Sequence, residues 1–80
     1  MPTVLRAKGF VIKIHLNDHA PAHVHVLKAE GEAVITLQPV IILRFWGMRR
    51  RDLADAKRIV LENQAVLINS WKGIHDEQGF

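Results

Sequence analysis

The chain has 80 residues, no cysteine and a formal net charge of +3. A chain this short forms one domain, residues 1–80, and buries only about two thirds of its unfolded surface or less, so a homo-oligomer or a protein partner is one way to add stability. Without cysteine it has no disulfide, thiolate metal site or cysteine nucleophile, which fits a reducing compartment. We expect a cytoplasmic, soluble protein with no membrane association, because no segment reaches the roughly 18 apolar residues of a membrane span and no signal-peptide core is present.

Alternation of apolar and polar residues predicts a hairpin in the first third of the chain. In residues 10–15, Phe10, Ile12 and Ile14 are expected on one face of a strand. Lys13 and His15 are expected on the opposite face with Val11. Residues 16–22 contain asparagine, aspartate and proline, which favour a turn, and the alternation resumes in residues 23–28. The hairpin therefore has a polar loop.

Further strands follow, and the period then changes to that of a helix. Residues 29–32 predict a second turn before a β-branched run at 33–37, while residues 4–5 and 40–45 are candidates for additional strands, the latter also fitting an irregular crossover. From about Arg50 to Lys72 apolar residues recur at helical spacing, and Gly73 predicts the helix end. The predicted fold class is α+β: a small antiparallel β-sheet of three to four strands packed by one long C-terminal helix. Asn63 and Gln64 interrupt the apolar stripe, so this helix is expected to bend or break there. The stripe comprises Leu53, Ala56, Ile59, Val60, Leu67, Ile68 and Trp71.

A short histidine-rich segment, residues 17–26, is the strongest functional signal. It holds three of the five histidines of the chain. Because side chains alternate along a strand, His23 and His25 are expected on one face, with Val24 and Val26 on the other. Such a face is polar and titrates near neutral pH.

Three interpretations of this face remain open. His23 and His25 could act as a general acid/base pair, assisted by His15 or His19, or they could simply form a polar sheet surface. Asp18 is expected to cap the turn or, alternatively, to orient an imidazole. A metal site made of His15, His23 and His25 is the weaker option, because it needs a register that brings His15 across from the other two.

A concentration of positive charge predicts where an acidic partner or nucleic acid would bind. Phe45 and Trp46 lie between Arg44 and the run Arg49 to Arg51 in the sequence. Alternating aromatic and basic residues suit base stacking and phosphate contact. The competing interpretation places at least one of these two aromatic residues in the core, which we favour, and Trp71 is also expected in the core. The candidate nucleic-acid contacts are Lys13, Arg44, Trp46, Arg49, Arg50 and Arg51.

Four segments carry a resemblance to a known family. They are residues 1–6, Asn17-Asp18-His19, Pro21-Ala22-His23-Val24-His25-Val26, and Gly47 before a charged helix that carries Leu53 and ends near Trp71. Over nearly its whole length the chain resembles small bacterial proteins catalogued as domain of unknown function 4160. Members often lie beside a second small protein, which implies that they are toxins of toxin-antitoxin pairs, although the family implies no settled mechanism.

Two positions depart from the family pattern. Ala22 stands where a second proline is usual, and Arg49 stands where a small polar residue opens the helix, so a side-chain N-cap is missing and positive charge lies at the helix N-terminus. The resemblance nevertheless predicts a toxin silenced by a small cognate antitoxin. Its expected activity is metal-independent acid/base cleavage of RNA without a cofactor. The alternatives are a non-catalytic protein- or nucleic-acid-binding module and, more weakly, a histidine metal-binding protein.

Overall fold

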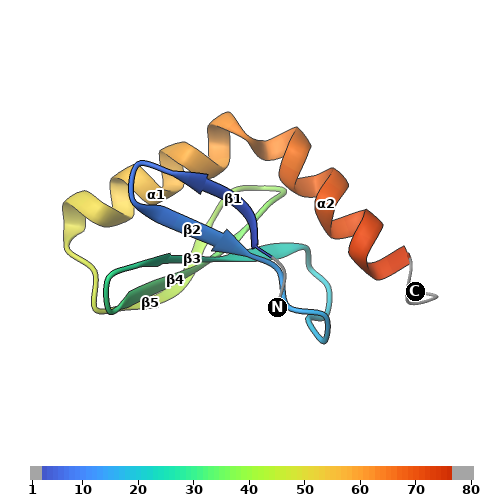
Figure 1. Ribbon diagram of the computed structural model, residues 1–80, viewed down its shortest axis with the longest axis horizontal. Helices are drawn as coiled ribbons and strands as arrows, with labels where there is room; N and C mark the ends of the chain where they lie inside the picture. Colours follow the sequence, from blue (N-terminus) through green and yellow to red (C-terminus); the bar gives the residue numbers. More distant parts are fainter. Residues whose placement is uncertain (1–2, 77–80) are drawn as a thin grey trace.

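The computed structural model describes residues 3–76 and shows an α+β fold with five strands and two helices. The strands form one antiparallel sheet in the order β1-β2-β3-β4-β5, so each strand pairs with its neighbours in sequence (Figure 1). The expectation of three to four strands was therefore too low. The elements are β1 (Thr3–Ala7), β2 (Phe10–Lys13), β3 (His23–Lys28), β4 (Gly31–Thr36), β5 (Ile42–Trp46), α1 (Arg50–Glu62) and α2 (Gln64–Asp76).

Two tight hairpins set the register of the sheet. Lys8 and Gly9 join β1 to β2 with left-handed φ angles of 52° and 84°, as a two-residue turn that matches strand twist requires. The β3–β4 turn also has only two residues, because Lys28 pairs with Gly31. Strand β4 thus begins two residues before the predicted start at residue 33, which brings Glu32 into the sheet.

One face of the sheet is covered by the helices and forms the core. The predicted alternation is confirmed here, since Ile12, Val24 and Val26 are fully buried beneath the helices while His23 and His25 lie on the other face. Ala56, Ile59, Val60 and Leu67 bring the helical stripe onto this layer. The strands therefore present their polar side chains on the face that no helix covers, which we call the open face (Figure 1).

The helical region is broken at Asn63. Its backbone N–H donates to the carbonyls of Ile59 and Val60, and its side chain donates to Ile59, so the first helix ends there. Gln64 opens α2 and donates from Nε2 to the carbonyl of Leu37 at 2.6 Å, which fixes the break against the sheet. The predicted end at Gly73 was wrong, because α2 continues to Asp76.

The start of α1 shows how the chain manages an arginine at the N-cap. The carboxylate of Asp52 accepts a hydrogen bond from the backbone N–H of Arg49 at 3.3 Å and forms an ion pair with Lys28 at 3.2 Å. Both donors lower the pKa of Asp52, and the Arg49 amide has the larger effect. An acidic residue in the first turn therefore replaces the missing side-chain cap.

Strand β5 forms an exposed edge of the sheet. Phe45 is 51% exposed and Trp46 is 49% exposed, so the expectation that at least one of them lies in the core was wrong. Trp71 does pack against the core.

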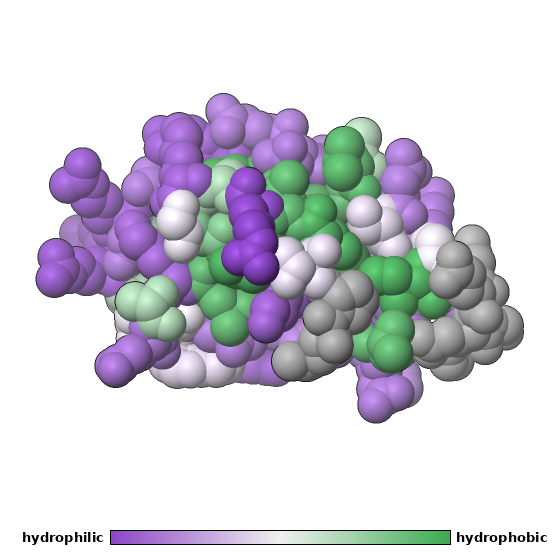
Figure 2. All heavy atoms as spheres, in the orientation of Figure 1, coloured by the Kyte–Doolittle hydropathy of each residue, from purple (hydrophilic) through white to green (hydrophobic). Residues whose placement is uncertain are grey.

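Figure 2 shows hydrophilic residues along the helices and at the end where α1 begins, with apolar surface between. Within residues 3–76, no helix has the length and apolar character needed to cross a membrane.

Candidate functional site

The open face gathers titratable side chains through the register of four strands. Lys13 pairs with His25, His25 with Val34, and Val34 with Arg44. Because directly paired residues point to the same side of a sheet, these side chains form one row across the open face. Lys13 and Arg44 lie on either side of His25 in this row. Lys13 is one strand away from His25, and Arg44 is two strands, about 10 Å, away.

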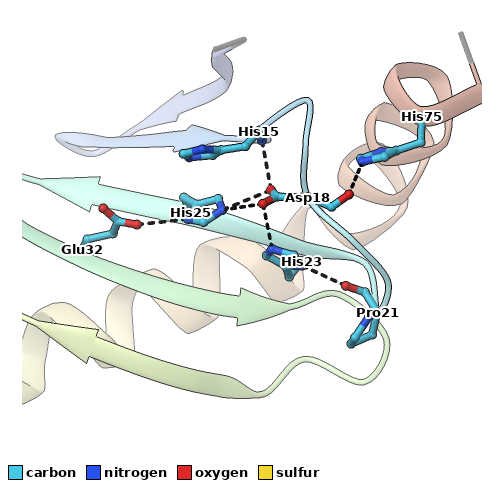
Figure 3. A network of polar contacts seen from close by, with 7 residues as sticks. All are labelled: His15, Asp18, Pro21, His23, His25, Glu32 and His75. Carbon is cyan, nitrogen blue, oxygen red and sulfur yellow. Dashed lines mark hydrogen bonds and ion pairs between the residues drawn. The ribbon is translucent and has the colours of Figure 1, made fainter. Parts of the chain in front are cut away.

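The loop between β2 and β3 folds back over this face and is held by Asp18. Its backbone N–H donates to the carbonyl of His15 at 3.1 Å, and its Oδ2 accepts from the backbone N–H of His15 at 3.0 Å. These two bonds make the turn that the sequence predicts for Asp18. They also direct its carboxylate toward the histidines (Figure 3).

The Asp18 carboxylate contacts two imidazoles at once. Oδ1 lies 3.3 Å from Nε2 of His23, and Oδ2 lies 3.1 Å from Nε2 of His25. The Nδ1–H of His23 donates a hydrogen bond to the carbonyl oxygen of Pro21 at 2.8 Å, and Nε2 faces Asp18. Asp18 therefore has both predicted roles, and the imidazoles it orients are His23 and His25, while His19 is exposed.

His25 is the buried centre of the cluster, with 7% of its surface exposed. Both ring nitrogens face carboxylates: Nδ1 lies 3.0 Å from Oε2 of Glu32, and Nε2 lies 3.1 Å from Asp18. A neutral imidazole donates only one hydrogen bond, so satisfying both carboxylates takes a second proton or another cation between Nε2 and Asp18. The ring of His15 lies against that of His25 with 3.8 Å between centroids. We call His15, Asp18, His23, His25 and Glu32 the histidine cluster.

Burial and neighbouring charge shift the pKa values of two members. Burial, and then the charge of His25, lower the pKa of His15, although Asp18 and Glu32 act in the opposite sense. Burial acts to raise the pKa of Asp18, but the His15 amide and the charges of His23 and His25 together outweigh it, so this pKa is lowered. Near neutral pH the cluster therefore holds an ionised carboxylate beside a neutral imidazole.

Helix α2 supplies a residue to which the sequence assigned no role. His75 is 7% exposed, and its Nε2 donates to the carbonyl of Asp18 at 3.0 Å. Its ring stacks on Trp71 with 3.9 Å between centroids, and Trp71 in turn lies 5.2 Å from the ring of His23. The last turns of α2 thus hold the loop that carries Asp18. The only sequence signal for His75 was its spacing of four from Trp71 on the apolar stripe.

Arg49, Arg50 and Arg51 lie at the opposite end of the sheet, where α1 begins. Arg49 and Arg51 line a pocket of about 730 Å³ together with Lys28, Glu30, Asp52 and Asp55. Lys28 is three residues, about 10 Å, along β3 from His25. The structure therefore brings Lys13 and Arg44, rather than Arg49 to Arg51, to the face of the histidine cluster.

Comparison with known proteins gives a family but no described function. No curated protein and no solved structure matches the chain. The family model described as "Domain of unknown function (DUF4160)" matches residues 9–72, which include every member of the histidine cluster. The match covers most of the chain, and the protein therefore belongs to the DUF4160 family.

Proposed function

We propose that this protein is the toxin of a bacterial two-protein module and that it cleaves RNA at the histidine cluster. The toxin part rests on the resemblance described above. The observation that carries the chemistry is the Asp18 carboxylate held within 3.3 Å of both His23 and His25. A carboxylate that orients an imidazole and stabilises its protonated form is a common part of acid/base sites.

The proposed reaction needs two proton transfers. One imidazole takes the proton of an RNA 2′-hydroxyl, whose oxygen then forms a bond to the adjacent phosphorus. The bond from phosphorus to the 5′-oxygen breaks, and a second imidazole donates a proton to that oxygen. The products are a 2′,3′-cyclic phosphate and a 5′-hydroxyl. His23, whose side chain is more exposed than that of His25, is the first candidate for contact with RNA, while Lys13 and Arg44 on the same face are suited to hold phosphate.

Induced expression in a bacterium without the partner gene tests this proposal. Wild type is expected to arrest growth, and the His23→Ala, His25→Ala double variant is expected to grow normally, because it lacks both proton-transfer groups. Cellular RNA from arrested cells should carry new 5′-hydroxyl ends. Asn69→Ala, an exposed change on α2, serves as the control that should still arrest growth.

Equal soluble yields of all variants are required for this comparison. Normal growth with wild type would contradict the toxin role. Arrest by the double variant would show that the effect does not need these histidines.

A binding module is the second candidate, and the exposed aromatic residues of β5 favour it. Phe45 and Trp46 lie half-exposed on an edge strand beside Arg44, an arrangement suited to stacking bases of single-stranded RNA and contacting its phosphates. In this case affinity depends on the stacking residues and not on the histidines.

Trp46→Ala separates the two candidates by direct binding. Loss of one base-stacking contact is expected to weaken binding of a labelled single-stranded RNA roughly 5- to 100-fold in fluorescence anisotropy. Leu61→Ala is the matched control, because Leu61 is equally exposed, at 52%, on α1. Similar affinities for wild type and Trp46→Ala would remove β5 as the RNA surface.

A further inference from the structure

Three donor atoms of the histidine cluster converge closely enough to share one cation. His15, Asp18 and His25 each offer a ligand atom, and these atoms all lie within 4.8 Å of one another. Around a tetrahedral zinc ion with bonds of about 2.0–2.1 Å, ligand atoms are about 3.3 Å apart. Only small side-chain movements separate the observed arrangement from that geometry.

We propose that His15, Asp18 and His25 form a binding site for one divalent transition-metal ion, with Zn²⁺ as the first candidate. Two imidazoles and one carboxylate are donors typical of zinc and neighbouring transition metals, whereas Mg²⁺ and Ca²⁺ prefer oxygen ligands alone. The site goes beyond the proposed RNA cleavage and competes with it, because Nε2 of His25 cannot transfer a proton while it binds an ion, and ion binding does not require RNA.

The hydrogen bonds of His25 already have the form of a metal-binding histidine. Glu32 accepts from Nδ1 at 3.0 Å, which turns the lone pair of Nε2 toward Asp18 Oδ2 at 3.1 Å. Metal-binding histidines usually donate their other ring N–H to such a carboxylate. A metal ion between Nε2 and Asp18 takes the place of the second proton that the metal-free cluster needs.

The positions of the other two ligands also suit a cation. His15 lies against His25 with 3.8 Å between ring centroids, so a ring nitrogen of each lies within 4.8 Å of the other and of a carboxylate oxygen of Asp18. The proposed ligand set contains Asp18 in the place that the sequence-based metal site gave to His23. His23 contacts the other carboxylate oxygen of Asp18, Oδ1, and lies outside the ligand set.

Three protein ligands leave a coordination position open, as in catalytic zinc sites. Helix α2 and the Trp71–His75 stack hold the loop of Asp18 from behind, through its backbone carbonyl. This contact holds the loop without using the carboxylate, and Oδ2 is fixed in addition by the backbone N–H of His15.

Isothermal titration of the full chain with ZnCl₂ tests the site, after chelator treatment and removal of any histidine tag. We expect one ion per chain, and Co²⁺ in place of Zn²⁺ should give visible absorption bands of a nitrogen- and oxygen-ligated, four-coordinate site. His15→Phe preserves the ring contact with His25 but removes the donor atom, so it should weaken Zn²⁺ binding at least about 100-fold, the upper end of what loss of an outer partner costs. Glu32→Gln should weaken it about 10- to 100-fold by disturbing His25.

The matched control is His19→Ala, because His19 is an exposed histidine of the same loop and lies outside the ligand set. It should bind Zn²⁺ as wild type does. Absence of Zn²⁺ binding to wild type would overturn the site, and so would unchanged binding by His15→Phe. Binding is measured directly, so a negative growth assay would reject the toxin role and leave the metal site standing.

Discussion

Gly31→Ala is expected to destabilise the protein strongly, although it adds only one methyl group. A Cβ at this position would lie 2.3 Å from the carbonyl oxygen of Gly47 and 2.7 Å from its carbonyl carbon. Real Cβ atoms do not approach backbone so closely, and both strands are fixed by their pairing, so β4 and the end of β5 have to separate. Overpacking costs about 1–3 kcal/mol, and a clash with backbone belongs at or above the upper end. For a chain of this length that corresponds to a fall in Tm of roughly 12 °C or more.

Gly73→Ala provides the matched control. Gly73 lies inside α2, and a Cβ there would have no heavy atom within 4 Å apart from the adjacent residues and the backbone of its own helix. The same substitution should therefore raise stability by about 0.5–1 kcal/mol, because glycine is a poor helix former. Thermal unfolding followed by circular dichroism measures both. Equal Tm values for Gly31→Ala and wild type would show that β4 and Gly47 do not pack closely.

Asp18→Asn is expected to have the largest effect of any change in the histidine cluster. The amide keeps the size of the side chain but loses the charge that contacts His23 and His25. Loss of hydrogen bonds to a charged group costs about 1.5–3 kcal/mol, so Tm should fall by roughly 10 °C near neutral pH in the presence of a chelator. The same variant should lose Zn²⁺ binding.

The effect of Asp18→Asn should depend on pH in a defined direction. Because the pKa of Asp18 is lowered in the folded protein, its ionised form contributes stability at pH values above the ordinary aspartate pKa of about 3.9. That contribution is lost as the pH falls through the lowered value of the folded state. The Tm difference between wild type and Asp18→Asn should therefore shrink in acid.

Asp55→Asn is the control for this measurement. Asp55 pairs with Arg58 at 2.7 Å on the surface of α1, and exposed pairs of this kind contribute about 0–1 kcal/mol. If Asp55→Asn and Asp18→Asn lowered Tm equally at neutral pH, the contacts of Asp18 would have no special contribution to stability.

Most of the fold followed from local patterns. Alternation in residues 10–15 and 23–28 predicted which side chains enter the core, and Val24 and Val26 confirmed it. The interruption at Asn63 and Gln64 marked the break between the helices. The errors occurred where a local signal was weak or misleading: Gly73 suggested a helix end, and the turn residues 29–32 concealed the start of β4.

The sequence by itself determined that His23 and His25 share a polar face, because that depends only on the two-residue period of a strand. It did not determine their partners. Asp18 reaches them only because its loop folds back over the sheet, Glu32 because the β3–β4 turn has two residues, and His75 because α2 extends past Gly73. These contacts join residues 5 to 57 positions apart, so they depend on strand register and helix packing, which only the tertiary structure decides.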